Sequence, residues 1–328
     1  MEKHKTVSEC WKALAGCRES CCGLRSIPVA EYGGREIRAG IFFPEGTEAL
    51  LTGFSEHIPL KLPQGYGFRV EALGGDVPDS SRHWLAIIRT FCGDTELFAI
   101  MAEDLKAVLE KRQFALSAFL DRVQAWQIFM EQKHPPVMSE HTETGLFGEL
   151  VVLKRLMETL GEQRAVQAWK GPDGGLQDFR LEEFILEVKT SSAPKGFPIT
   201  VCSLEQLDEG LAQCPLYLAG VRLRRDEEGT SVSDLVEEMV ERLRSNDSLL
   251  MLFERLLIRM GYVRGADMGK RRFSTLALHV IQVSDALPHL RRSLLPEAFL
   301  SASYSIDIDR THCSTLHLED LIREYCHG

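Results

Sequence analysis

The chain has 328 residues, of which 44% are hydrophobic and 26% charged, with 26 glycines and 13 prolines. These values are ordinary for globular proteins and exclude disordered, collagen-like and coiled-coil classes. No apolar run approaches the roughly 18 residues that a membrane span needs. The N-terminus also lacks the layout of a signal peptide, so we expect a cytoplasmic protein with no membrane partner.

The net charge of −10 is unevenly distributed along the chain. The segment from Arg255 to Arg292 contains eight Lys and Arg residues and two Asp residues, which gives it a charge of +6. An acidic protein is unsuited to coating nucleic acid, but a local basic patch permits a groove that follows phosphates. Lys270, Arg271 and Arg272 are the predicted DNA contacts in this window, and an ordinary solvated surface is the alternative.

Four of the nine cysteines lie near the N-terminus, in a segment that reads as a helix over residues 7–22. Cys10, Cys17 and Cys21 fall on one face of that helix, which is typical of a buried stripe of small residues. Cys22 is their neighbour. A metal or iron–sulfur site would need a CxxC pair or a following pair of histidines, and neither is present.

Short apolar stretches between turn residues predict a mostly antiparallel sheet after this helix. The expected strands include residues 27–32, 37–43, 67–73 and 84–91. Helical periodicity follows over residues 99–132 and ends at His134-Pro135-Pro136. We therefore expect an N-terminal α+β domain at residues 1–133.

A second domain is expected at residues 139–225. Ser139 is a good N-cap for a helix that runs to Leu160, with Gly161 just beyond its end. The expected elements that follow are strands at 166–170, 176–181 and 184–190, a helix at 203–213 and a strand at 216–223. Their order, αβββαβ, predicts a compact α/β core within a chain that is α+β overall.

A C-terminal extension is expected at residues 226–328. It should contain a helical stretch over 233–260 and strands near 273–283 and 303–309.

Glu149 interrupts the apolar stripe of the predicted 139–160 helix. On a helical wheel it falls among Leu146, Leu150, Leu153 and Leu156. A carboxylate on a buried stripe is costly unless it is paired, hydrogen-bonded or bound to a metal. A salt bridge to a neighbouring Lys or Arg and a functional role are equal alternatives for it.

Glu187 and Lys189 lie on one face of a predicted apolar strand, together with Ile185. An acid beside a base on a covered face suggests chemistry, and an ordinary surface pair on an edge strand is the alternative. If Glu182-Glu183 is a two-residue turn, Asp178 lies directly opposite Glu187, with Cβ atoms roughly 5 Å apart. Two carboxylates at that distance repel each other, and a divalent cation is the usual remedy.

Asp178 is followed, after eight intervening residues, by Glu187-Val188-Lys189, and a helix that carries Glu149 precedes it. This pattern resembles the PD-(D/E)XK nuclease superfamily of restriction-endonuclease-like folds. The segments Trp169-x-Gly171-Pro172 and Gln177-Asp178-Phe179 look like one bacterial family within it. The resemblance runs over most of the chain.

The resemblance implies cleavage of DNA phosphodiester bonds with Mg²⁺ or Mn²⁺. Asp178 and Glu187 would be metal ligands, Glu149 a further acid near the metal, and Lys189 the catalytic lysine. Members look like components of restriction or phage-defence operons, beside methylases or ATPases. A single site cuts one strand, so a double-strand cut would need a homodimer or two binding events.

Two positions have competing interpretations. Asp173, in the literal Pro-Asp sequence, precedes two glycines, so we favour a turn there and prefer Asp178 as the ligand. Gln206 follows Ser203 at the spacing of a capping box, which we favour over the catalytic role that some related nucleases give a glutamine. A non-cleaving DNA-binding or scaffold subunit and a DNA-repair nuclease are the alternative functions.

Overall fold

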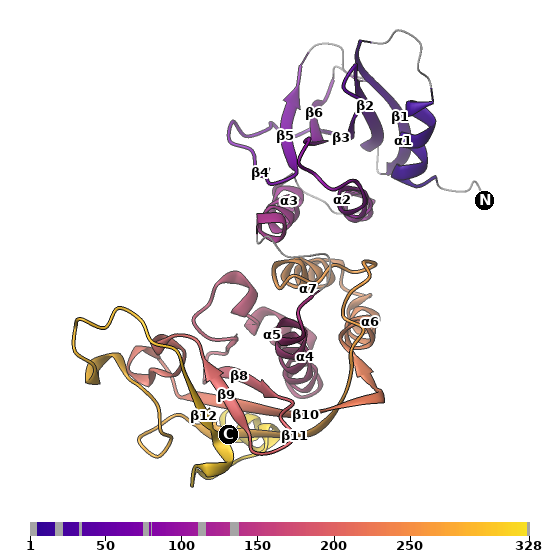
Figure 1. The fold of residues 1–328 in the computed structure, drawn as a ribbon. Helices are drawn as coiled ribbons and strands as arrows, with labels where there is room; N and C mark the ends of the chain where they lie inside the picture. The colour runs from indigo at the N-terminus through magenta and orange to yellow at the C-terminus, as the bar shows by residue number, and fades with distance from the viewer. Residues whose placement is uncertain are drawn as a thin grey trace. The chain divides into compact units, whose positions relative to one another are not determined.

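The computed structural model describes residues 5–16, 22–32, 35–74, 79, 81–110, 116–131 and 138–326. The chain divides into two units, residues 1–134 and 135–328, which are coloured indigo to magenta and magenta to yellow in Figure 1. It is an α+β protein, as the sequence predicts. Within the described ranges, none of the helices is long and apolar enough to cross a membrane.

The N-terminal unit is an antiparallel sheet with three helices. Its strands are β1 (Gly23–Tyr32), β2 (Arg35–Phe43), β3 (Thr47–Phe54), β4 (Gln64–Gly65), β5 (Phe68–Leu73) and β6 (His83–Arg89), in the order β1-β2-β3-β6-β5-β4. Its helices are α1 (Val7–Ala15), α2 (Thr95–Leu109) and α3 (Leu116–Glu131). The antiparallel sheet is confirmed, and the helical periodicity expected over residues 99–132 corresponds to α2 and α3.

One strand of this unit, β3, was not predicted, and the predicted cysteine stripe lies only in part within the described residues. Strand β3 was missed because six consecutive buried residues end it, and such a run lacks the alternation that marks a half-buried strand. Cys10 is buried on α1, as expected, and Cys22 is exposed. Cys17 and Cys21 lie outside the described residues, so the predicted cysteine stripe stays a prediction.

The C-terminal unit is built on a mixed sheet in the order β11-β10-β8-β7 (Figure 1). Strand β8 (Ile185–Ser191) runs parallel to β10 (Leu216–Ser231) and antiparallel to β7 (Phe179–Arg180), and β11 (Arg272–Gln282) pairs with β10. A second sheet joins β9 (Pro198–Val201) to β12 (Tyr304–Asp307). The helices are α4 (Glu140–Leu160), α5 (Glu162–Ala168), α6 (Val232–Leu243), α7 (Asp247–Arg259) and α8 (Leu318–Cys326).

Helix α4 packs closely on β8. Ser139 caps the helix by accepting a hydrogen bond from the Thr142 amide at 3.1 Å, which confirms the predicted start. A Cβ atom at Gly148 would lie 1.8 Å from Thr190 Oγ1, so only glycine allows this approach of helix and strand. The close contact fixes the position of Glu149, the next residue, relative to β8.

Two predicted elements of this unit are wrong, and one strand, β9, was not predicted. Residues 166–170 belong largely to α5, where Ala165, Val166 and Ala168 form its buried side. The helix expected at 203–213 is two 3-10 turns, η2 (Leu204–Leu207) and η3 (Glu209–Leu211), because the Asp208 side chain accepts the Gly210 amide and interrupts it. Strand β9 pairs with distant β12 and not with a neighbour in sequence.

The expected boundary near residue 225 lies within β10. The far end of this strand continues to Ser231, which pairs with Arg272 of β11. Residues from the expected extension therefore complete the sheet that carries β8.

Candidate active site

Glu149 points into the protein from the middle of α4, with 9% of its surface exposed. Its Oε2 accepts a hydrogen bond of 2.7 Å from Nε1 of Trp169, a residue just after α5. The Trp169 ring stacks on Phe179 with a centroid distance of 6.4 Å. The salt bridge considered from the sequence is thus not the observed interaction, since the partner of this carboxylate is a neutral indole.

The hairpin formed by β7 and β8 has the predicted register. Phe179 pairs with Leu186, and the Leu181 amide donates to the Phe184 carbonyl at 3.0 Å, which leaves Glu182 and Glu183 as the turn. The same register places Asp178 opposite Glu187.

Asp178 lies immediately before β7 and is hydrogen-bonded to the backbone of β8. Its Oδ2 accepts the Val188 amide at 2.7 Å, while its carbonyl accepts the amides of Lys170 and Gly171 at 2.7 and 3.0 Å. A Cβ atom at Gly171 would lie 2.9 Å from Asp178 Oδ1 and 3.5 Å from Glu149 Oε2. The two carboxylates therefore lie on the same side of the Gly171 backbone.

Glu187 is buried on the inner strand β8, with only 1% of its side chain exposed. Lys189 Nζ forms an ion pair of 2.7 Å with Glu187 Oε1, and Glu187 Oε2 accepts no hydrogen bond from the described residues. The alternative of a surface pair on an edge strand is wrong, because β10 and β7 flank β8 on its two sides.

Gln206 contacts Lys189 from the η2 turn. Its Oε1 accepts hydrogen bonds from Lys189 Nζ at 3.2 Å and from the Cys202 amide at 2.8 Å. The side chain of Ser203 makes no capping hydrogen bond, so the favoured capping box is wrong. The glutamine instead fixes the position of the lysine amine.

Burial raises the pKa values of all three carboxyl groups. It raises the pKa of Asp178 to about 6 and, together with the Asp178 charge, that of Glu187 to about 8. Burial and the Asp178 charge also raise the pKa of Glu149, which the Trp169 hydrogen bond opposes. Burial alone would lower the pKa of Lys189, but the neighbouring Glu187 and Asp178 charges raise it overall. One ammonium group cannot compensate three ionised acids, which is why these carboxyl groups hold their protons to higher pH.

Asp173, the alternative ligand, lies outside this group. It is the last residue of η1 (Gly171–Asp173) and pairs with Arg259 and Arg255 of α7, the latter at 3.4 Å. Its carboxylate thus connects the η1 turn to α7, whereas Asp178 faces Glu187.

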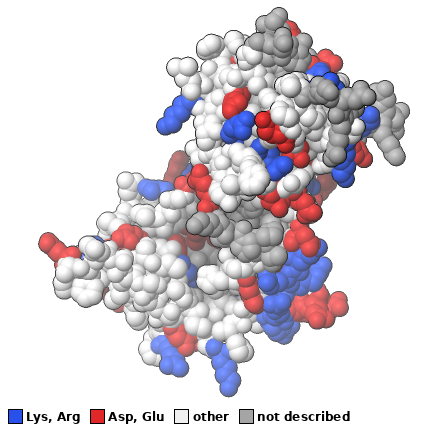
Figure 2. All heavy atoms as spheres, turned by 45° about the horizontal axis from the view of Figure 1, so that its top comes forward, with Lys and Arg blue, Asp and Glu red and all other residues white. Residues whose placement is uncertain are grey.

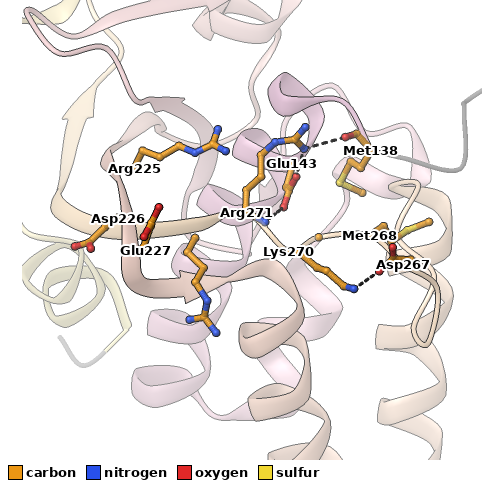
Figure 3. Close-up of a pocket in the computed structure, with 11 residues that line it drawn as sticks. Met138, Glu143, Arg225, Asp226, Glu227, Asp267, Met268, Lys270 and Arg271 are labelled. Carbon is orange, nitrogen blue, oxygen red and sulfur yellow. Dashed lines mark hydrogen bonds and ion pairs between the residues drawn. The ribbon is translucent and has the colours of Figure 1, made fainter.

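The three predicted DNA contacts border a cavity of about 660 Å³ (Figure 3). Each is paired with an acid: Lys270 with Asp267, Arg271 with Glu143, and Arg272 with Asp234 at 3.2 Å. On the face drawn in Figure 2, blue and red side chains are interspersed. DNA binding by Lys270, Arg271 and Arg272 stays a prediction.

Sequence reasoning did not assign two residues of the site. Trp169 and Gly171 were noted only as parts of a motif, yet they hold and border the Glu149 and Asp178 carboxylates. Their distance from Asp178 in the sequence is the signal that could have identified them. Trp169, an indole donor, precedes Asp178 by nine residues, and Gly171 precedes it by seven.

A divalent cation fits the chemistry of these donors, although its site is not fully assembled. Within the described ranges, no three His, Cys, Asp or Glu side chains converge as a ready-made metal-binding group. Glu187 Oε2 is buried and accepts no hydrogen bond from the described residues, however, and carboxylate oxygens are the ligands that Mg²⁺ prefers. Asp178, Glu187 and Glu149 are the residues that could hold such an ion.

A helix-covered mixed sheet with two acids and a lysine on its β7–β8 hairpin defines a nuclease-like protein. The family model described as "Putative PD-(D/E)XK family member (DUF4420)" matches residues 7–309, and the chain belongs to that family. This confirms the resemblance inferred from the sequence. No curated protein and no solved structure matches the chain.

Proposed function

We propose that the protein is a metal-dependent endonuclease that hydrolyses phosphodiester bonds of DNA. The observation that carries the proposal is the buried Glu187 carboxylate, which lies opposite Asp178 and shares the Lys189 ammonium group with it, so that two acids face one ammonium group. A buried carboxylate in this state is costly unless a cation or a proton compensates it. A cation at this position would also lie where a phosphate and a water molecule could be brought together.

Each of these side chains has its own proposed role in the reaction. Asp178 and Glu187 would hold Mg²⁺ or Mn²⁺, with Glu149 as the further acid. A cation bound there supplies positive charge to the phosphate and lowers the pKa of a water molecule. Lys189, held between Glu187 and Gln206, orients the attacking water or offsets charge on the phosphorus.

The biological setting follows from the family resemblance. We propose a role in a restriction or phage-defence system, with a methylase or an ATPase as the partner protein. A double-strand cut would require a second copy of the chain or a second binding event, because each chain offers one site.

Cleavage of supercoiled DNA by the purified protein tests the proposal. We expect nicking or cutting that requires Mg²⁺ or Mn²⁺ and is lost in Asp178→Asn and Lys189→Met. Asp173→Asn is the matched control, since it neutralises a carboxylate five residues away that pairs with α7. Activity that survives in both site variants, or no activity on several DNA substrates, would refute the proposal. The second result would favour a scaffold subunit.

A further inference from the structure

Lys170 is an exposed lysine whose side chain has no partner among the described residues. Most Lys and Arg side chains in the described part of the C-terminal unit pair with an acid. The exceptions within these ranges are Lys170, Arg180, Lys195 and Arg292. Arg180 donates instead to the Gln213 side chain, and Arg292 donates to the Phe299 carbonyl. An acidic unit thus leaves very few cations free, which makes the place of each one informative.

The backbone of Lys170 is hydrogen-bonded to that of Asp178. The Lys170 and Gly171 amides both donate to the Asp178 carbonyl, at 2.7 and 3.0 Å, and Trp169 forms an antiparallel bridge with Phe179. Two residues thus oppose one, as in a β-bulge, an irregularity that is common next to active sites and redirects a side chain there. Lys170 therefore lies at the margin of the candidate active site, directly before the glycine that borders the Asp178 carboxylate.

The acids closest to Lys170 already have other partners. Asp173 is the first acid after it in the sequence, but the Asp173 carboxylate pairs with Arg259 and Arg255 of α7. Asp178 Oδ2 accepts a backbone amide of β8 at 2.7 Å. Because these carboxylates are engaged elsewhere, the ammonium group of Lys170 is available to an anion that comes from outside the protein.

A backbone phosphate is the anion that suits this position. Each DNA strand carries one negative charge per nucleotide, so a strand held at Lys189 brings further phosphates beside it. Lysine binds phosphate as a flexible point charge, and such contacts position a strand without reading its sequence. Lys170 can supply this contact without breaking an ion pair, whereas Lys270, Arg271 and Arg272 are each paired with an acid.

We propose that Lys170 binds a backbone phosphate next to the scissile phosphate and thereby positions the cut strand over Asp178 and Glu187. The contact is independent of base identity, so it serves every DNA sequence equally. This inference rests on the proposed nuclease function for the identity of the ligand as DNA. It adds a substrate-binding residue to the acids that would hold a cation and to Lys189.

The salt dependence of DNA binding tests this inference apart from cleavage. A fluorescein-labelled duplex is titrated with the full chain in Ca²⁺ at several KCl concentrations, and affinities are read from anisotropy. The variants are Lys170→Met, which removes the charge, and Lys170→Arg, which retains it. Lys154→Met is the matched control, because the Lys154 ammonium group, in the same unit, pairs with Glu238 at 2.7 Å.

We expect the wild type, Lys170→Arg and Lys154→Met to share one slope of log affinity against log salt concentration. Lys170→Met should reduce this slope by about 0.9, the value for one lost phosphate contact, and equally so on duplexes of unrelated sequence. A Lys170→Met variant with the wild-type slope would overturn the inference, as would a wild type that binds no DNA. An equal reduction in Lys154→Met would also overturn it, since the effect would then follow net charge alone.

Cleavage in Mg²⁺ separates this inference from the proposed function. If the wild type cuts DNA and Lys170→Met keeps the wild-type slope, the Lys170 assignment is wrong and the nuclease assignment stands. If Lys170→Met shows the reduced slope but the wild type cuts nothing, Lys170 is a DNA contact and the nuclease assignment is wrong.

Discussion

The indole nitrogen of Trp169 donates a 2.7 Å hydrogen bond to the buried carboxylate of Glu149. This bond uses one Glu149 oxygen and fixes the direction in which the other can meet a cation. Hydrogen bonds of this kind, one step away from the metal, typically change affinity or activity by roughly 10–100-fold when removed. Trp169 is thus a positioning residue that acts through Glu149.

Trp169→Phe should lower metal-dependent cleavage by roughly 10–100-fold, because it removes the donor and retains most of the aromatic packing. Mn²⁺ titration by calorimetry and initial cleavage rates would measure the effect. Trp126→Phe is the control, since Trp126 Nε1 donates a similar bond of 2.8 Å to Asp104 in the other unit. Equal losses of activity in both variants would mean that Trp169 acts only through stability.

Gly171→Ala should abolish cleavage while leaving the protein folded. The added Cβ atom would lie 2.9 Å from Asp178 Oδ1, so the carboxylate must move away from its position. Gly145→Ala on α4 meets no atom within 4 Å and should stabilise the protein by about 0.5–1 kcal/mol. Thermal melts and cleavage assays of the two variants together would show whether space at Gly171 matters. Normal cleavage by Gly171→Ala would contradict the prediction.

The metal-free protein should lose stability as the pH rises from about 5 to 9. The pKa of Glu187 is raised to about 8 in the folded state, so the folded protein holds this proton more tightly than the unfolded chain does. The protonated Glu187 contributes its full share to the free energy of unfolding at low pH, and this share is lost as the pH passes 8. The loss amounts to about a few kcal/mol. Asp178, with a pKa of about 6, adds the same trend at lower pH.

Urea unfolding in EDTA at several pH values would measure this trend. Glu187→Gln should lose less stability than the wild type between pH 6 and 9, because only the raised pKa values of Asp178 and Glu149 then remain to change the proton count. Mg²⁺ should stabilise the wild type more at pH 8.5 than at pH 6, since protons compete with the ion. A wild type whose stability is independent of pH in this range would contradict the assigned burial of Glu187.

The sequence was most informative where the chain is locally constrained. Only two turn residues lie between Leu181 and Phe184, which pair across the β7–β8 hairpin, so the register of Asp178 against Glu187 could be counted directly. Glu149 stood out because one carboxylate interrupted an apolar stripe. Both inferences needed only neighbouring residues and the periods of helix and strand.

Contacts between distant segments could not be inferred in the same way. The indole donor for Glu149 comes from another element, and β9 finds its partner β12 about a hundred residues later. The same holds for Arg271, whose acidic partner Glu143 lies 128 residues earlier. A cluster of cations in the sequence therefore reveals its charge but not which acids it meets.

Arg271 should contribute to stability more than to DNA binding. Its amide donates to Glu143 Oε1 at 2.8 Å, its guanidinium group pairs with the same carboxylate, and Glu143 is only 1% exposed. Arg271→Met would leave this buried charge without its partner, which typically costs about 3–5 kcal/mol. Lys270→Met is the matched control: its pair with Asp267 is largely exposed and should cost less than about 1 kcal/mol. Chemical denaturation and DNA-binding isotherms of both variants separate the two roles. An Arg271→Met protein with wild-type stability and much weaker DNA binding would instead establish the DNA contact that the sequence predicts.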